Sequence, residues 1–389
     1  MKTWSVFCGF IFLVGCHGDP AAAVPQLIHK LKSNSVKDRT MAAAELGEIG
    51  PPAAAAIPAL VGALADKDED VRWLAVNSLG LVGRRKKELA PHIVKMLNDK
   101  SRKVRAQAIE ALARVAPDEP ETITQLMRVL EDTDFYMKTT AAYNLGFLRE
   151  RAKKAVPRLA AILGEAKKSA DKTTIIQALG EIGTEACEAV PVLIELLQRE
   201  KDKDVLIQLA QTLGAIGPAA KEAVPILLKK LKQQNPVSDH QLRIAIVQSF
   251  GQMGRDAKSA VSTLVHMIGD KNVEIREYAV QSIGQIGQVP AELIPKIAAA
   301  LKDPEISVRR FAIQALRKMK TKAKNAIPLL CERLRAEDEY ERGLVAEALG
   351  DMGPDAAEAI PLLQVATKDA SPYVREKAVA ALKKIQTKE

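Results

Sequence analysis

Apolar and polar residues alternate along this chain with the spacing of paired amphipathic helices. In one unit, residues 56–64 carry apolar side chains at helical spacing, and Pro58 suits a first helical turn, where its missing N–H is not needed. Residues 66–70 are polar and mostly acidic, which favours the positive end of the next helix. That second helix carries an apolar stripe of four residues: Val71, Ala75, Leu79 and Val82. Gly83 can then adopt the left-handed conformation that ends a helix, so the unit is predicted to be a helix pair with one apolar side.

The same unit recurs with a period of about 33 residues. A proline marks the first helix of most copies, at positions 25, 58, 91, 157, 191, 225, 295, 328 and 361. A Leu-Gly-x-x-Gly motif or a close variant ends the second helix, at residues 46–50, 79–83, 179–183, 213–217, 283–287 and 349–353, with weaker copies at 112–116, 145–149, 250–254, 316–320 and 382–386. Helix capping and helix packing explain these glycines better than a phosphate-binding loop does. A helix pair cannot bury its apolar side alone, so we predict an all-α solenoid of about eleven stacked pairs over residues 24–389.

A column of arginines in the second helices resembles that of a known family. Each follows Val or Ile and has an Asp six residues before it: Asp66 and Arg72, Asp99 and Arg105, Asp270 and Arg276, Asp303 and Arg309, Asp369 and Arg375. The signatures of ankyrin and tetratricopeptide repeats, which have similar periods, are absent. The pattern resembles HEAT repeats, in the short form of phycobilisome-lyase-like HEAT proteins, over nearly the whole chain. The resemblance implies a right-handed superhelix of the armadillo/HEAT type, in which Asp–Arg pairs tie adjacent repeats together.

The first 23 residues do not follow the repeat. Lys2 precedes a short apolar stretch, and the segment Leu13-Val14-Gly15-Cys16 resembles the lipobox of bacterial lipoproteins. That resemblance implies a signal peptide over residues 1–15, lipid on Cys16 and a short tether over residues 16–23. Acyl chains would then hold the protein on a membrane. We therefore expect a lipid-anchored, extracytoplasmic protein of a bacterial cell envelope, with a cytoplasmic location as the alternative if the signal is not real.

The sequence offers little for catalysis. It contains no Walker-type loop, no Gly-x-Gly-x-x-Gly and no Gly-x-Ser-x-Gly, and none of its five histidines has a second ligand at metal-binding spacing. Its four cysteines are too few for a disulfide scaffold in a chain this long. We therefore expect a protein that is not an enzyme and needs no metal or cofactor. An enzyme or accessory subunit of the phycobilin-lyase-like or hydroxylase-like kind stays open as an alternative.

Charge permits an anionic partner without identifying one. The 57 Lys and Arg exceed the 48 Asp and Glu, giving a formal net charge of +9, but the two signs are interleaved. Nucleic acid is an unlikely partner because a continuous basic stripe with aromatic stacking positions is missing, although a nucleic-acid-binding HEAT-like protein remains a second alternative. Basic clusters such as residues 84–87 could instead contact anionic lipid head groups.

The HEAT resemblance implies that the second helices line the concave side, where a protein or peptide would bind. Positions one, five and nine residues after the arginine column face away from the apolar stripe. Glutamine fills the middle position in five successive repeats: Gln177, Gln211, Gln248, Gln281 and Gln314. Nearer the N-terminus the same positions hold Trp73, Asn77, Leu81, Tyr143 and Phe147, and aromatic side chains are frequent anchors of interfaces. We predict that these ten residues bind the partner. The alternative is that the glutamines only solubilise a helix face and the aromatics only cover gaps between helices.

Overall fold

The computed structural model describes residues 19–235 and 238–387, and every regular element in these ranges is an α-helix or a 3-10 helix. The first helices of the pairs carry odd numbers: α1 (Val24–Lys30), α3 (Ile57–Ala63), α5 (Ala90–Met96), α7 (Pro120–Val129), α9 (Val156–Glu165), α11 (Val190–Arg199), α13 (Val224–Lys232), α15 (Val261–Met267), α17 (Ile294–Ala299), α19 (Ile327–Arg333) and α21 (Ile360–Ala366). The second helices carry even numbers and are longer: α2 (Val36–Ile49), α4 (Glu69–Val82), α6 (Arg102–Val115), α8 (Phe135–Phe147), α10 (Ser169–Ile182), α12 (Lys203–Ile216), α14 (His240–Met253), α16 (Val273–Ile286), α18 (Ile306–Met319), α20 (Glu339–Asp351) and α22 (Pro372–Gln386). The prediction of an all-α chain of eleven helix pairs is confirmed.

Short 3-10 segments lead into or extend the odd-numbered helices. They are η1 (Pro20–Ala23), η2 (Pro51–Ala56), η3 (Lys87–Leu89), η4 (Arg149–Ala155), η5 (Gly183–Ala189), η6 (Gly217–Ala223), η7 (Gly254–Ala260), η8 (Ala291–Leu293), η9 (Ala300–Lys302), η10 (Lys320–Ala326) and η11 (Gly353–Ala359). Prolines stand at the first positions of most odd helices, as predicted, because those N–H groups have no partner within the helix. Several even helices begin at an acidic cap. The Asp68 carboxylate, for example, accepts hydrogen bonds from the N–H groups of Asp70 and Val71.

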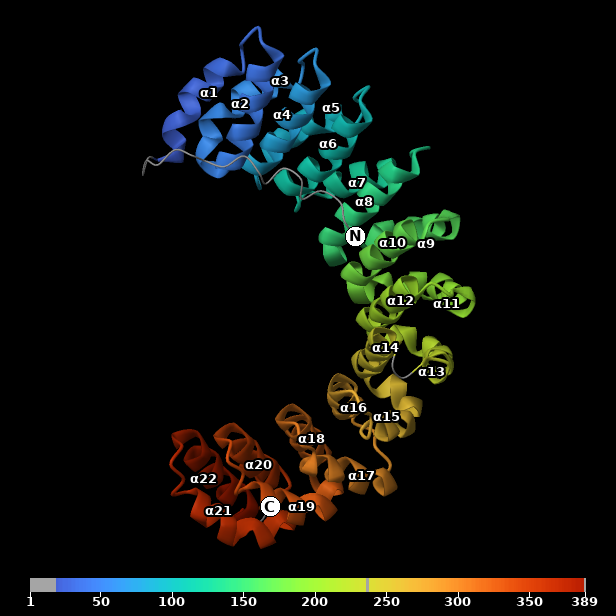
Figure 1. Cartoon of the computed structure of the whole chain (residues 1–389), viewed down its shortest axis with the longest axis vertical. Coiled ribbons are helices and arrows are strands. Elements are labelled where there is room, and N and C mark those ends of the chain that lie inside the picture. Colours follow the sequence, from blue (N-terminus) through green and yellow to red (C-terminus); the bar gives the residue numbers. More distant parts are fainter. Residues whose placement is uncertain (1–18, 236–237, 388–389) are drawn as a thin grey trace. The chain divides into compact units, whose positions relative to one another are not determined.

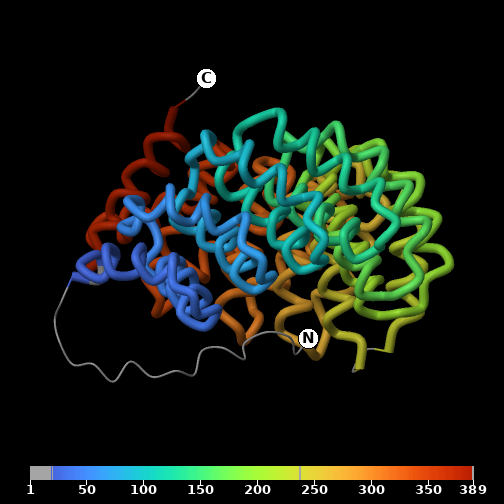
Figure 2. The backbone as a smooth tube through the Cα atoms, turned by 90° about the horizontal axis from the view of Figure 1, so that it is seen from above, coloured from blue at the N-terminus to red at the C-terminus, as the bar shows by residue number. Residues whose placement is uncertain are grey.

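The chain divides into two compact units, one ending at Asn144 and the other beginning at Leu145. In the first unit α2, α4 and α6 pack against one another in turn, in the second unit α10 to α22 do the same, and the odd helices lie on the other side (Figure 1). The backbone trace in Figure 2 shows the same arrangement of each pair beside its neighbours in sequence. The apolar stripes meet between the two layers, where residues such as Leu79 and Leu213 are fully buried. We call the side of each unit that its even helices form the even-helix surface.

The two glycines of the Leu-Gly-x-x-Gly motif have different tasks. The first lets neighbouring even helices approach: a Cβ at Gly350 would lie 2.8 Å from the Cα of Ala381 on the next even helix. The second holds a positive φ, between 62° and 77°, in six repeats: Gly50, Gly183, Gly217, Gly254, Gly287 and Gly353. Lys320 stands at the same motif position with φ 51° and ψ −131°, a backbone conformation that favours glycine. The prediction that packing and capping explain this motif is confirmed.

Gly83 corrects one detail of that prediction. Its φ is −95°, so it does not end α4 in the left-handed conformation expected from the sequence. The positive φ falls two residues later, at Arg85, where φ is 62°. Leu89 explains the difference: its Cδ1 lies only 2.1 Å from where a Cβ on Gly83 would be, so this glycine makes room for a side chain.

Asp–Arg pairs tie adjacent repeats, as the family resemblance implies. The Arg72 guanidinium donates through Nε and one terminal nitrogen to the Asp99 carboxylate, at 2.8 and 2.9 Å, and through the other nitrogen to the carbonyl of Asp66 at 2.9 Å. Each Asp therefore bonds to one arginine through its carboxylate and to the next through its carbonyl. Equivalent pairs join Arg39 to Asp66, Arg243 to Asp270, Arg276 to Asp303, and Arg342 to Asp369. The arginine column is therefore a structural ladder, and the arginine charge is neutralised in these five pairs. Arg105 and Arg375 donate to the backbone carbonyls of Asp99 and Asp369 instead.

One rung of this ladder is built differently. Position 336, where the period places an Asp, is Ala. The fully buried carboxylate of Glu341, on α20, takes its place and lies 3.0 Å from the Arg309 guanidinium. Arg333 of α19 pairs with the same carboxylate at 2.6 Å. Glu341 thus holds three helices together at a point where the repeated motif is broken.

Among residues 19–235 and 238–387, no helix has both the length and the apolar character that a bilayer crossing requires. The proposed signal segment and Cys16 lie outside the described residues.

Candidate partner-binding surface

The five predicted glutamines lie on the even-helix surface of the second unit, one on each helix from α10 to α18. Gln177 and Gln211 are exposed, and Gln248, Gln281 and Gln314 are half-buried. Gln281 and Gln314 line one small pocket of about 100 Å³, together with Phe311 and Lys318. The side-chain hydrogen bonds of the described residues do not involve any of the five amides. The surface therefore presents a row of amides, each with donors and an acceptor that a ligand can use.

Trp73 and Asn77 lie one turn apart on α4 in the first unit, but their polar groups are already engaged. The Trp73 indole N–H donates to the side-chain oxygen of Gln107 on α6 at 3.1 Å, and the Gln107 amide donates to Asn77 at 3.2 Å. Arg114 closes the network through Asn77 and Glu110. Trp73 is half-buried and packs against the core of this unit. Its indole therefore contributes to packing as well as to the surface.

Tyr143 and Phe147 form a second apolar group, one turn apart on α8. They are 45% and 65% exposed, which is unusual for large aromatic side chains. Leu81, the remaining predicted residue, lies on α4 and is half-buried. Since α6 stands between α4 and α8 in the sequence of even helices, the predicted apolar residues make two groups on different helices (Figure 1). The ten predicted residues are therefore all at or near the surface, but they do not form one cluster.

A further pocket, which the sequence analysis did not predict, lies at the C-terminal end of the second unit. It has a volume of about 610 Å³ and is lined by Gln314, Arg317, Lys318, Lys320, Tyr340, Leu344, Glu347, Asp351 and Tyr373. We call it the tyrosine pocket. The rings of Tyr340 and Tyr373 stack with centroids 5.8 Å apart and planes 15° apart. The guanidinium of Arg310 lies 4.9 Å from the Tyr340 centroid, and the ammonium of Lys377 lies 5.4 Å from that of Tyr373.

Most charges of the tyrosine pocket are paired. Arg317 bridges Glu347 at 2.7 Å and Asp351 at 2.6 Å, and Lys384 adds a second bond to Asp351 at 2.6 Å. Burial alone would raise the pKa of Asp351, but the hydrogen bonds from Lys384 and Arg317 outweigh burial and leave that pKa below its ordinary value. Asp351 is therefore ionised near neutral pH. Lys318 and Lys320 are exposed, and no ion pair of the described residues includes either of them.

The repeat does contain a signal for this pocket. Tyr340 and Tyr373 each stand two residues before an arginine of the column and are one period apart. Gly343 makes room for the second ring, since a Cβ there would lie 2.1 Å from Cε1 of Tyr373. Glu347 and Asp351 occupy the same repeat positions as Gln314 and Lys318, one repeat later. Continuing the surface positions into the last two repeats would have reached the site.

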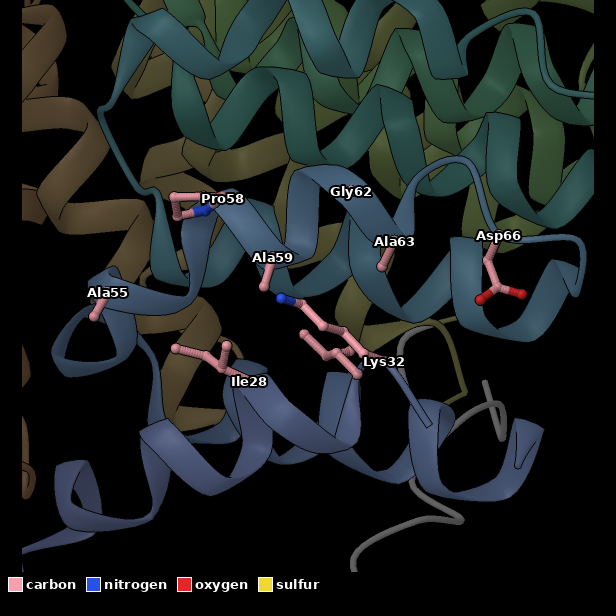
Figure 3. A pocket seen from close by; sticks show the side chains of 9 residues that line it. Ile28, Lys32, Ala55, Pro58, Ala59, Gly62, Ala63 and Asp66 are labelled. Carbon is pink, nitrogen blue, oxygen red and sulfur yellow. The ribbon is translucent and has the colours of Figure 1, made fainter. Parts of the chain in front are cut away.

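Another pocket, between α1 and α3, is less suited to a partner. It measures about 470 Å³ and lies among odd helices, with mostly small residues as its walls. Figure 3 shows the Lys32 side chain extending across it toward Ala59. Its carboxylate, Asp66, is already bound by Arg39.

The described residues contain no group of three or more His, Cys, Asp or Glu side chains able to hold a metal ion. Cys187 and Cys331 are free thiols in this part of the chain. Burial raises the pKa of the Cys331 thiol to about 11, so it is protonated and a poor nucleophile at neutral pH.

A family model described as HEAT repeats matches residues 24–113, 90–180, 168–237, 230–317, 288–350 and 327–389, which together span everything after residue 23. The model is that of HEAT repeats in general, so the phycobilisome-lyase-like form stays a prediction. No curated protein matches the sequence.

Solved structures with the same architecture include importin beta in a polyethylene glycol condition, with a TM-score of 0.64 at 14% identity over 93% of this chain and 59% of that chain. Importin beta in an ammonium sulfate condition gives a TM-score of 0.62 at 14% identity over 93% of this chain and 57% of that chain. Kap121p bound to the extreme C-terminus of the protein phosphatase Cdc14p gives 0.50 at 13% identity over 94% and 45%. The chain thus spans less than two thirds of each of these proteins, and at this identity the likeness shows the fold alone. Neither the family model nor these structures indicate a catalytic family.

Proposed function

Because this chain belongs to the HEAT-repeat family, we propose that it is a non-catalytic scaffold that binds a protein or an extended peptide on its even-helix surface. The row of five glutamine amides on α10 to α18 carries this proposal. Their side chains make no hydrogen bond within the described part of the chain, and they recur at the spacing of the repeats. An amide offers two donors and an acceptor, which match the alternating N–H and C=O groups of an extended backbone.

One of the solved structures with the same architecture supports the same kind of partner. Kap121p is bound there to the extreme C-terminus of another protein, which is a short chain segment. The exposed Phe147 on α8, which belongs to the second unit like the glutamines, supplies apolar contact area at the surface. The proposed partner is therefore a chain segment with both an accessible backbone and apolar side chains.

A photo-crosslinker placed at single positions tests this proposal without a known partner. Gln177 and Gln211 on the even helices are the test positions, and Gln198, an exposed glutamine on the odd helix α11, is the matched control. Partner adducts from the two test positions and none from Gln198 are expected. Equal adducts from Gln198, or none from either test position in cells that contain the protein at its native level, would contradict the proposal.

We further propose that the scaffold is tethered to a bacterial membrane by lipid on Cys16. The support is the lipobox-like segment Leu13-Val14-Gly15-Cys16 after a short apolar stretch. Cell fractionation followed by the intact mass of the native protein tests it. A membrane-bound species that lacks residues 1–15 and carries acyl chains is expected, whereas a soluble, full-length and unmodified species would exclude the tether.

A further inference from the structure

The side chains of the tyrosine pocket indicate which kind of partner side chain it binds. We propose that it anchors an acidic side chain of an extended segment that lies along the even-helix surface, an inference that rests on the proposed function. The pocket continues the glutamine row, because Gln314 and Lys318 line both this pocket and the small pocket that contains Gln281. A chain bound along the glutamines would therefore reach the tyrosine pocket at the C-terminal end of the unit.

The charged side chains of the tyrosine pocket favour an acidic group on the partner, because the pocket's carboxylates are paired and two of its lysines are not. Both carboxylates of the pocket, Glu347 and Asp351, are held by Arg317, with Lys384 on Asp351 and Lys377 3.7 Å from Glu347. An incoming cation would have to displace these partners. An incoming carboxylate instead meets the ammonium groups of Lys318 and Lys320, which are exposed and belong to none of the ion pairs in the described part of the chain. A hydrogen bond between two charged groups is stronger than one between neutral groups, so a carboxylate binds these lysines more strongly than a neutral side chain does.

The tyrosines disfavour a nucleic acid. Single-stranded nucleic acids bind by stacking bases on open aromatic faces. Tyr340 is already approached by Arg310 from α18 at 4.9 Å and by Tyr373 from α22 at 5.8 Å, and Tyr373 also has Lys377 at 5.4 Å. Tyr340 is 44% exposed, but each ring already has a cation and the other ring as neighbours, with which a stacking base would have to compete.

The same contacts make the pocket rigid. Tyr373 lies over Gly343, where any Cβ would overlap the ring, and the cations hold both rings in their stack. A tyrosine that is ordered before binding loses little conformational freedom when a partner arrives. The rings therefore form a fixed wall beside Lys318 and Lys320, against which the apolar part of an acidic side chain and its neighbours can pack.

A displayed library of random linear peptides, selected on the whole protein, provides the probe. Enriched peptides are then synthesised with a fluorescein label, and their affinity is measured by anisotropy at low and at moderate salt. The test variant is Lys318→Glu with Lys320→Glu. The matched control is Lys229→Glu with Lys258→Glu, which changes the net charge equally at exposed positions on α13 and η7. Unchanged thermal unfolding of each variant establishes that it is folded.

Enrichment of Asp or Glu, a loss of affinity of about tenfold or more in the test variant, and less than about threefold in the control are expected. Peptides that bind without any preference for acids, or that bind the test variant as well as the control, would overturn the inference and leave the scaffold proposal standing. No enrichment of any peptide would overturn both. Displacement of an acidic peptide by a short oligothymidylate at equal affinity would also overturn the inference, since it would show a general anion site.

Discussion

The buried Glu341 gives the sharpest test of how the repeats are held together. Replacing Glu341 by alanine removes the carboxylate that pairs Arg309 at 3.0 Å and Arg333 at 2.6 Å. The side chains of the two arginines are only 16% and 27% exposed, so water can replace the lost partner only in part. Breaking a buried ion pair by removing one partner costs about 3–5 kcal/mol. We expect Glu341→Ala to lower the free energy of unfolding by about 3 kcal/mol, the low end of that range, because both arginines reach some solvent.

A second substitution separates the missing ion pair from other effects of the change. Ala336→Asp restores the Asp that the 33-residue period places there. Its separation from Arg309 along the sequence is the same as that of Asp303 from Arg276 and of Asp369 from Arg342, which form ion pairs. In the Glu341→Ala background, the added Asp is expected to recover about half of the loss, about 1.5 kcal/mol. In the wild-type background it places a second acid beside Glu341 and should give no gain.

Urea unfolding followed by far-ultraviolet circular dichroism measures both effects. With an m-value of about 2 kcal/mol per molar urea, a loss of 3 kcal/mol moves the midpoint down by about 1.5 M. Hydrogen exchange over α18, α19 and α20 shows whether the loss is confined to these helices, because repeats in a solenoid contact only their neighbours. A loss below about 1 kcal/mol, or no recovery with Ala336→Asp, would refute the reasoning.

Three further predictions follow from the backbone, the ladder and the surface. Lys320→Gly should raise the free energy of unfolding by about 1 kcal/mol, because glycine adopts a positive φ without strain. Lys320→Ala removes the same charge and should give no such gain. Equal urea midpoints for the two variants would show that the backbone is unstrained. The hydrogen bonds from Arg39 and Arg342 lower the pKa of Asp66 and Asp369, so the unfolded chain binds more protons than the folded one and stability should fall below about pH 4, as these carboxylates protonate. The double variant Asp66→Asn, Asp369→Asn should show a shallower acid dependence in urea titrations, and an unchanged slope would contradict this. Trp73→Ala should lower the free energy of unfolding by about 2 kcal/mol, because the indole is half-buried and donates a hydrogen bond to Gln107. Phe147→Ala, at a position 65% exposed, should lower it by less than about 0.5 kcal/mol. Similar losses of stability in thermal unfolding would contradict the assignment of Trp73 to packing.

The sequence was sufficient for the helix pairs and their number, and the family resemblance implied the ladder that links them. Each depends on residues that are close in sequence or lie in adjacent repeats, and repetition makes such signals readable without an alignment. Arg72 and Asp99 illustrate this, because they are 27 residues apart and the same separation recurs in four other pairs. The positions of the glutamine row followed in the same way from the helical period.

The structure was needed wherever the outcome depended on contacts between neighbouring helices. The pattern gave Gly83 and Gly50 the same role, but the approach of Leu89 to Gly83 moves the positive φ to Arg85. The break in the ladder at Ala336 is visible in the sequence, yet only packing shows that Glu341 is buried beside Arg309 and replaces the missing Asp.

The partner-binding residues also depend in part on the sequence and in part on the tertiary structure. Periodicity determines which residues of this chain face outward, because side-chain direction along a helix follows from local geometry. Whether an outward side chain is available depends on what the next helix presents to it. Trp73 is engaged by Gln107, the five glutamines are not engaged, and Tyr340 stacks on Tyr373 because Gly343 leaves space for the ring. These are contacts between residues on different helices, and only the tertiary structure decides them.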